Sequence, residues 1–304
     1  MKPKLSKPGT TPNTYFFCGM AVATIIVFSL VVVHFYAFIL APAPVQSKLA
    51  MSIGEKLMHS AAKPVVIPPP LPTPVATAYP PAGWHCVKVP ILMYHHVEPL
   101  ALAASEGHAQ LTVDSDIFSR QMQYLSDAGY HVIPLRTLSD FFDSKANLPP
   151  KAIVLTFDDG YSDFYTYAVP VLEAHGFKSD LFVPTGLMEN PGYLSWSQIQ
   201  SASMRGVSID HHTWSHANVA QNGEAFFHRE LDIPSQQLIE HGYGPVTIFA
   251  YPYGTHNEKD KEELAKRGFT LAVTTLSGQM QCTEDRLALH RTRIGNQPLR
   301  SYGL

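Results

Sequence analysis

Two adjacent carboxylates follow an apolar run in "AIVLTFDDG". Asp158 and Asp159 come directly after residues 152–157, which read as a buried strand, and directly before Gly160. Like charges at this distance repel, and burial makes each carboxylate harder to ionise. A compensating positive group, such as a bound cation, is therefore expected beside the pair.

Two histidines with a metal-ligand spacing lie downstream in "DHHTWSH". Three residues separate His212 from His216, so one ion lies within reach of both imidazoles. Two neutral imidazoles and one carboxylate leave an open position for water, which is the arrangement of a catalytic zinc site. We expect one aspartate of the pair to bind the cation, whose charge keeps the other ionised. The same donors also suit cobalt, nickel or iron.

Short apolar runs alternate with amphipathic stretches after residue 89, which predicts a parallel α/β sheet. The expected strands are 90–94, 130–133, 152–157, 180–183, 207–209, 246–251, 270–275 and 287–294. Helices are expected over 115–128, up to about 176, and over 257–267, each ending near a glycine. Seven or eight strands favour a closed or nearly closed (β/α) barrel, with an open doubly wound sheet as the alternative. The motifs follow strands, so they should meet at one mouth.

Four motifs together resemble the polysaccharide deacetylases of the NodB homology group, carbohydrate esterase family four. They are "VPILMYHHV", "TFDDG", "HTWSH" and "FAYPYG", in that order, and the resemblance covers roughly residues 87–295. It implies a distorted (β/α) barrel and metal-dependent removal of acetyl groups from N-acetylglucosamine polymers, with zinc as the expected metal.

The resemblance also implies roles for individual residues. Asp158 corresponds to the general base, and Asp159, His212 and His216 correspond to the metal ligands. The backbone N–H of Tyr253 corresponds to the donor that stabilises the oxyanion.

The sequence departs from the commonest family pattern at two places. Ala250 stands where many members have an arginine that contacts the base aspartate. In "LALHRTRI", His290 is a candidate for the general acid. The same stretch also resembles a strand of a subgroup similar to poly-N-acetylglucosamine deacetylases, and there Arg291 is the matching residue.

Other polar and aromatic residues near the motifs are candidates for substrate contacts. His95 and His96 are expected at the barrel mouth, with either a substrate role or a hydrogen bond to the rim. Tyr161 is expected to line the groove. Trp196 could stack on a sugar ring or pack at a helix start. His211 is interpreted as structural.

The N-terminal third predicts a membrane anchor and a spacer. Residues 1–14 carry Lys2, Lys4 and Lys7 and are expected in the cytoplasm; residues 15–40 are uncharged and long enough to span a bilayer. Residues 41–84 are proline-rich and read as a semi-rigid linker to a domain over 85–304. The expected location is the inner (cytoplasmic) membrane, single-pass, with the domain on the periplasmic or extracellular side. Cleavage after the apolar segment is the alternative to a permanent anchor.

The charge composition argues against nucleic-acid binding, and the cysteine positions predict a disulfide. A net charge of −3 with scattered basic residues gives no nucleic-acid-binding patch. Cys86 and Cys282 precede the first and last expected strands, so barrel closure would bring them together at the bottom rim, and we predict a disulfide.

The favoured function is a membrane-anchored N-deacetylase acting on poly-N-acetylglucosamine or peptidoglycan. Two alternatives are a catalytically silent polysaccharide-binding protein that retains the barrel, and a hydrolase of amides outside sugars.

Overall fold

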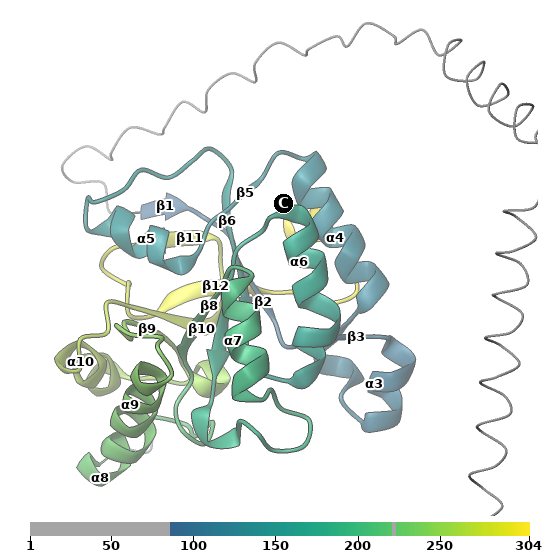
Figure 1. The fold of residues 1–304 in the computed structure, drawn as a ribbon. Helices are drawn as coiled ribbons and strands as arrows, with labels where there is room; N and C mark the ends of the chain where they lie inside the picture. The colour runs from purple at the N-terminus through teal and green to yellow at the C-terminus, as the bar shows by residue number, and fades with distance from the viewer. Residues whose placement is uncertain (1–85, 221–222) are drawn as a thin grey trace, which may run out of the picture. The chain divides into compact units, whose positions relative to one another are not determined.

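A closed barrel of parallel strands forms the centre of the computed structural model, which describes residues 86–220 and 223–304 (Figure 1). The eight-stranded sheet has the order β2-β12-β10-β9-β8-β7-β6-β5. Because β2 (Ile91–Tyr94) also pairs with β6 (Ala152–Phe157), seven of these strands close on themselves, and β5 (His131–Val132) is attached outside along β6. The predicted closed barrel is confirmed, and the open doubly wound sheet is wrong.

The other elements of the described residues alternate along the chain with these strands. The remaining barrel strands are β7 (Ser179–Val183), β8 (Val207–His211), β9 (Ile248–Ala250), β10 (Leu271–Ser277) and β12 (Leu289–Arg293). The helices are α3 (Leu100–Glu106), α4 (Ser115–Asp127), α5 (Leu135–Phe142), α6 (Val169–His175), α7 (Trp196–Met204), α8 (Glu224–Phe227), α9 (Ile233–Glu240) and α10 (Glu258–Lys266). Short 3₁₀ helices cover Ala109–Leu111, Thr185–Leu187, Pro252–Gly254 and Leu299–Tyr302, and π-helical turns cover Phe164–Ala168 and His228–Asp232.

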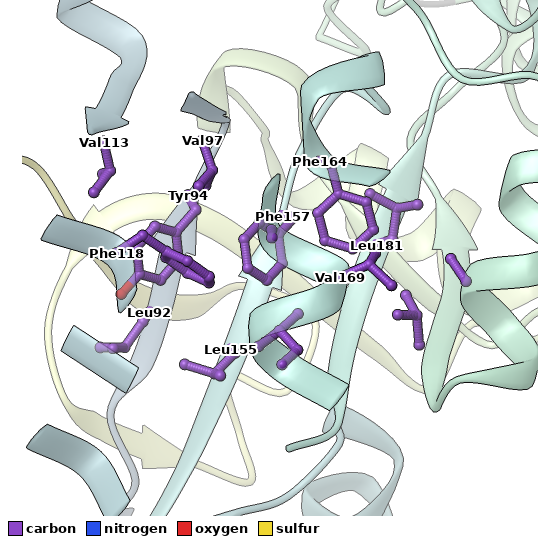
Figure 2. Close-up of a cluster of buried hydrophobic side chains, with 14 of the residues drawn as sticks. Leu92, Tyr94, Val97, Val113, Phe118, Leu155, Phe157, Phe164, Val169 and Leu181 are labelled. Carbon is purple, nitrogen blue, oxygen red and sulfur yellow. The ribbon is translucent and has the colours of Figure 1, made fainter. Parts of the chain in front are cut away.

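The outer face of the barrel carries the largest core. Every residue of β6 is buried, as expected for a parallel strand that is covered on both sides. Leu155 and Phe157 point outward with Leu92, Tyr94 and other side chains that lie under α4 and α6 (Figure 2). Tyr94 stacks on Phe157 with ring centroids 5.2 Å apart. This packing fixes the end of β6 and therefore the start of the segment that carries the two aspartates.

The inner face of the barrel changes character along its length. Val154 on β6 is apolar, whereas Thr156 and then Asp158 follow it at the period of two that keeps side chains on one face of a strand. Leu289, at the start of β12, belongs to the same apolar cluster as Val154, and Arg291 follows it. Along β6 and β12 the lumen-facing residues therefore change from apolar to polar toward the mouth.

Two small ribbons that the sequence did not reveal extend from the barrel. At the bottom, β1 (Cys86–Lys88) pairs antiparallel with β11 (Met280–Cys282) and places Cys86 opposite Cys282. The two cysteines form a disulfide, as predicted. At the mouth, β3 (His96–Glu98) pairs in parallel with β4 (Thr112–Asp114).

Local sequence signals explain the helix ends. Asp114 caps α4 by accepting a hydrogen bond from the N–H of Asp116, and Gly176 ends α6 in the left-handed conformation that glycine adopts without strain. Asn257 and Asp260 form a capping box at the start of α10. The helices predicted over 115–128 and 257–267 are confirmed to within one residue at either end.

The predicted anchor (15–40) and linker (41–84) lie outside the described residues. No helix within residues 86–220 and 223–304 has the length and apolar character to cross a membrane.

Candidate active site

Three segments that follow barrel strands bring the chemically active side chains together. The aspartate pair follows β6, His212 and His216 follow β8, and Tyr253 follows β9. The carboxyl ends of parallel strands share one edge, so residues far apart in sequence meet at the barrel mouth.

Asp159, His212 and His216 form a compact cluster. One ligand atom from each lies within 4.8 Å of the others. The Nε2 atoms of His212 and His216 lie 3.2 Å and 3.1 Å from Oδ1 of Asp159. Burial alone would raise the pKa of Asp159, but the two histidines lower it well below its usual range, so the carboxylate is ionised.

The atoms of this cluster fit a divalent cation. Nδ1 of His212 lies 2.8 Å from the carbonyl oxygen of Ala250, to which only a protonated nitrogen can donate. With Nδ1 directed at this carbonyl, Nε2 of His212 faces Asp159, in the orientation that a hydrogen-bonded metal ligand takes. Oδ1 of Asp159 is buried without a hydrogen-bond donor. Two nitrogens and one oxygen that converge in this way suit a zinc-like ion, and these three residues could hold it.

Asp158 is held by an arginine on β12, a strand that only β2 separates from β6 in the barrel. Nη1 and Nη2 of Arg291 donate to its two carboxylate oxygens at 2.7 Å and 2.6 Å. Arg291 is fully buried and also donates to the Thr274 carbonyl and the Thr156 hydroxyl. Burial alone would raise the pKa of Asp158, but the charge and hydrogen bonds of Arg291 lower it. Asp158 is therefore an ionised base whose orientation is fixed.

The loop after β9 presents the backbone of Tyr253 at the mouth. Pro252 and Gly254 flank Tyr253, whose φ is 61°. A Cβ on Gly254 would overlap the hydroxyl oxygen of Thr275, so only glycine permits this close approach to β10. The Tyr253 ring packs edge-on against His216, with centroids 4.7 Å apart. The Tyr253 peptide is thus rigidly placed beside the cluster.

Backbone strain gathers at the same place. Asp159, Thr213, His216 and Tyr253 all have φ between 57° and 74°, a region that costs a non-glycine residue about 1 kcal/mol or more. Such strain persists where the surrounding structure enforces it, and it often marks a functional site.

The histidines after β2 separate into two environments. His95 is within electrostatic reach of Asp158, Asp159 and Arg291, and burial lowers its pKa. His96 is buried, and its Nδ1 lies 2.7 Å from Oδ2 of Asp163. The ring of Tyr161 stacks on His96 at 3.7 Å. Burial raises the pKa of Tyr161, and the charge and hydrogen bond of Asp159 add to this effect. His95 and Tyr161 therefore border the cluster, whereas His96 lies one layer behind Tyr161.

Two other candidates have their own partners. His211 is fully buried between the Leu231 carbonyl and the Thr213 N–H, and burial lowers its pKa to about 3, so it is structural as interpreted. Trp196 starts α7 and stacks on His241 at 3.7 Å, which covers one face of its ring.

His290 faces away from the lumen. It precedes Arg291 on β12, and adjacent side chains of a strand point to opposite sides. A Cβ on Gly278 would lie 2.6 Å from its Nδ1, so the ring packs against the turn before β11. The structure does not bring His290 to the cluster.

One structural residue of the site gave no signal in the sequence. Glu230, in the π-helical turn, is fully buried and accepts hydrogen bonds from the N–H groups of Trp214 and Ser215. It holds the loop that positions His216. Nothing in the local pattern distinguishes this glutamate from a surface residue of an amphipathic helix.

This chain is similar to known proteins in sequence and in fold. The family model described as polysaccharide deacetylase matches residues 145–272. YxkH of Bacillus subtilis (strain 168), whose name assigns it to the polysaccharide deacetylases, is 31% identical over 209 residues, which cover 68% of this chain and 71% of that protein. The structure of the Streptococcus pyogenes deacetylase PplD in complex with acetate is similar with a TM-score of 0.64 and 29% identity, covering 68% of this chain and 92% of PplD.

A further relative names a substrate. The poly-β-1,6-N-acetyl-D-glucosamine N-deacetylase of Escherichia coli (strain K12) is 26% identical over 251 residues, which cover 68% of this chain. The match spans 36% of the length of the E. coli protein, so the comparison concerns about a third of that protein.

Proposed function

Since this chain belongs to the polysaccharide deacetylase family, we propose that it is a metal-dependent hydrolase that removes N-acetyl groups from an N-acetylglucosamine polymer. The observation that carries the proposal is the separation of roles between two adjacent aspartates. Asp159 faces two imidazoles, and Asp158 is held by Arg291.

The side chains divide the work of amide hydrolysis. A divalent cation bound by Asp159, His212 and His216 would polarise the acetyl carbonyl and lower the pKa of water. Asp158 accepts the proton of the attacking water, and Arg291 orients its carboxylate. The Tyr253 N–H stabilises the negative charge that develops on the carbonyl oxygen.

Departure of the sugar amine needs a proton donor, and His95 is placed for this task. It lies within electrostatic reach of both aspartates, whereas His290 packs outside the lumen. A histidine whose pKa is lowered is a stronger acid once it is protonated. Asp158 takes one proton from the attacking water, protonated His95 gives its proton to the amine nitrogen as the C–N bond breaks, and the proton on Asp158 then passes to His95, which restores both groups.

The relatives support a glycan as the substrate. The E. coli relative is named for poly-β-1,6-N-acetyl-D-glucosamine, and we propose the same class of polymer here, with peptidoglycan as the competing glycan. Each acetyl group that is removed exposes an amine, so the product becomes progressively cationic.

The proposed location is the outer side of the cytoplasmic membrane, with residues 15–40 as a single-pass anchor and residues 41–84 as a spacer. The disulfide between Cys86 and Cys282 supports an oxidising compartment such as the periplasm.

The test is acetate release by the full chain from three substrates: poly-N-acetylglucosamine, chito-oligosaccharides and peptidoglycan. We expect the fastest release from poly-N-acetylglucosamine, its loss with a chelator, and its return with added Zn²⁺. A small N-acetylated peptide serves as the control amide. Faster hydrolysis of the peptide, or release that a chelator leaves unchanged, would refute the proposal.

A further inference from the structure

A second cluster of metal-ligating side chains lies on the ribbon of β3 and β4, apart from the aspartate pair. His96, Glu98 and His108 each offer one ligand atom, and these atoms lie within 4.8 Å of one another. His96 and Glu98 bound β3, and their side chains share one face because they are two residues apart. His108 precedes the short 3₁₀ helix that leads into β4.

Carboxylates orient both imidazoles from behind. Oδ2 of Asp163 lies 2.7 Å from Nδ1 of His96, which leaves Nε2 as its free nitrogen. Oε2 of Glu106 lies 3.0 Å from Nε2 of His108, and Nδ1 of that ring lies 3.2 Å from Oε1 of Glu98. A carboxylate on the far nitrogen is the common outer partner of a metal-bound histidine, because it fixes the tautomer and raises the basicity of the ligand.

Glu98 supplies an independent sign of a missing partner. Glu98 is 3% exposed, and its Oε1 atom is buried without a hydrogen bond. The Thr112 hydroxyl lies 3.3 Å from Nδ1 of His108 but directs its proton to the His108 carbonyl oxygen, so a ring that carries its one proton on Nε2, toward Glu106, leaves Nδ1 without a donor. A bare nitrogen then faces a buried carboxylate oxygen, and both are electron-pair donors. An orphaned buried carboxylate is costly, so this arrangement calls for a positive partner between the two groups.

We propose that His96, Glu98 and His108 form a second site for a divalent transition-metal ion of the zinc class. Two imidazole nitrogens and one carboxylate oxygen match the ligands that such ions prefer. A cavity of about 510 Å³ borders all three residues and leaves room for water as a fourth ligand. The two rings are stacked with centroids 4.0 Å apart, so binding requires one ring to turn toward the ion.

The second site is linked to the first through one aromatic ring. Tyr161 stacks on His96 at 3.7 Å and hydrogen-bonds to Asp159. Asp163, two residues after Tyr161, orients His96 and also accepts a hydrogen bond from the N–H of Val97. An ion bound to His96 therefore fixes the imidazole ring against which Tyr161 stacks. Tyr161 in turn lies beside the carboxylate of Asp159 in the first cluster.

The test counts Zn²⁺ bound to the full chain after chelator treatment, by titration calorimetry and by metal analysis after dialysis. We expect two equivalents for the wild type and one for His108→Ala, Glu98→Gln and His216→Ala. The double variant His108→Ala/His216→Ala should bind none. His228→Ala removes an exposed histidine and should keep both equivalents. Circular dichroism verifies the fold of each variant, and His108, which is less buried than Glu98, provides the variant least prone to misfold.

The results separate the second site from the proposed deacetylase function. A wild type that binds one equivalent, with none left in folded His216→Ala, would overturn the second site and leave the first intact. A folded His108→Ala that still binds two equivalents would overturn it as well. One equivalent in folded His216→Ala, lost in the double variant, would support the second site even if the chain released no acetate.

Discussion

Arg291 on β12 donates to both carboxylate oxygens of Asp158, at 2.7 Å and 2.6 Å, inside the barrel lumen. The pair is fully buried, and two parallel N–H···O bonds between planar groups are among the strongest and most directional contacts in proteins. Arg291, on the last strand, thus orients the carboxylate of Asp158, which follows β6. Ala250 on β9 has no charged group that could do so.

Replacement of Arg291 by lysine should move the acidic limb of activity. Lysine cannot make two parallel bonds, so the pKa of Asp158, which Arg291 lowers, should rise. The acidic limb of log(kcat/KM) should shift to higher pH in Arg291→Lys. Arg205→Lys is the matched control, since Arg205 pairs with Glu173 at the surface. An unshifted limb in a folded Arg291→Lys would show that Asp158 is not the titrating base.

The Asp158–Arg291 pair should make the free energy of unfolding depend on pH in the acidic range. A carboxylate whose pKa is lowered in the folded state stabilises the protein above its unfolded pKa of about 4, and this contribution is lost as pH falls through the folded value. Breaking a buried pair by Arg291→Ala should cost about 3–5 kcal/mol in the free energy of unfolding at pH 7. Urea unfolding at pH 7 measures this cost, and a loss no larger than for Arg205→Ala would contradict it.

A second buried pair should give the opposite pH dependence. Asp180 and Asp210 are hydrogen-bonded in the lumen, and burial raises both pKa values, that of Asp210 to about 7. The folded state therefore retains a proton that the unfolded chain releases near pH 4, and stability falls as pH rises from about 4 to 7.

Asp180→Asn should remove much of this dependence. The amide can donate to Asp210 and still accept the Leu135 N–H that now meets Asp180. Unfolding midpoints of the chelator-treated protein between pH 5 and 8 should vary less for Asp180→Asn than for the wild type. Asp127→Asn, at an exposed position, should behave as the wild type. An equally steep loss of stability in Asp180→Asn would contradict the shared proton.

His95 and His290 should differ sharply in kinetics. His95→Ala should lower kcat by about 100-fold or more, as expected when a positioned proton donor is lost. His290→Ala should leave kcat unchanged, because that ring packs against the turn at Gly278. Acetate release at saturating substrate provides the measurement. The reverse order of effects would return the acid role to His290.

The disulfide should contribute substantially to stability. It closes a loop with a sequence separation of 196 residues, and removal of such a link typically costs about 2–5 kcal/mol. We expect Cys86→Ser/Cys282→Ser to unfold at a lower urea concentration than the wild type. Equal midpoints for the double variant and the wild type would contradict this expectation.

The barrel strands could be predicted because each is a short apolar run that ends in a polar motif. β6 is the clearest example, with six buried residues followed directly by two aspartates. Motifs that follow parallel strands share one edge of the sheet. The positions of the strand ends therefore predicted that Asp159, His212 and His216 lie together.

Other parts of the site depend on contacts that no local pattern reveals. Side-chain alternation could favour Arg291 over His290 only once the lumen-facing residues of β12 were known. Glu230 binds a loop 15 or 16 residues away in sequence, and its helix shows no sign of that task. The ribbon of β3 and β4 is three residues long on each strand, too short for a recognisable periodicity.

The most direct test of the central claim compares two adjacent isosteric changes, Asp158→Asn and Asp159→Asn, in the full chain. Zn²⁺ content and acetate release from poly-N-acetylglucosamine are measured on the same samples. Asp158→Asn should keep the metal content of the wild type and lose about 100-fold or more in rate, whereas Asp159→Asn should lose one equivalent of metal together with activity. Wild-type acetate release by Asp158→Asn, or an undiminished metal content in Asp159→Asn, would contradict the division of roles between these two carboxylates.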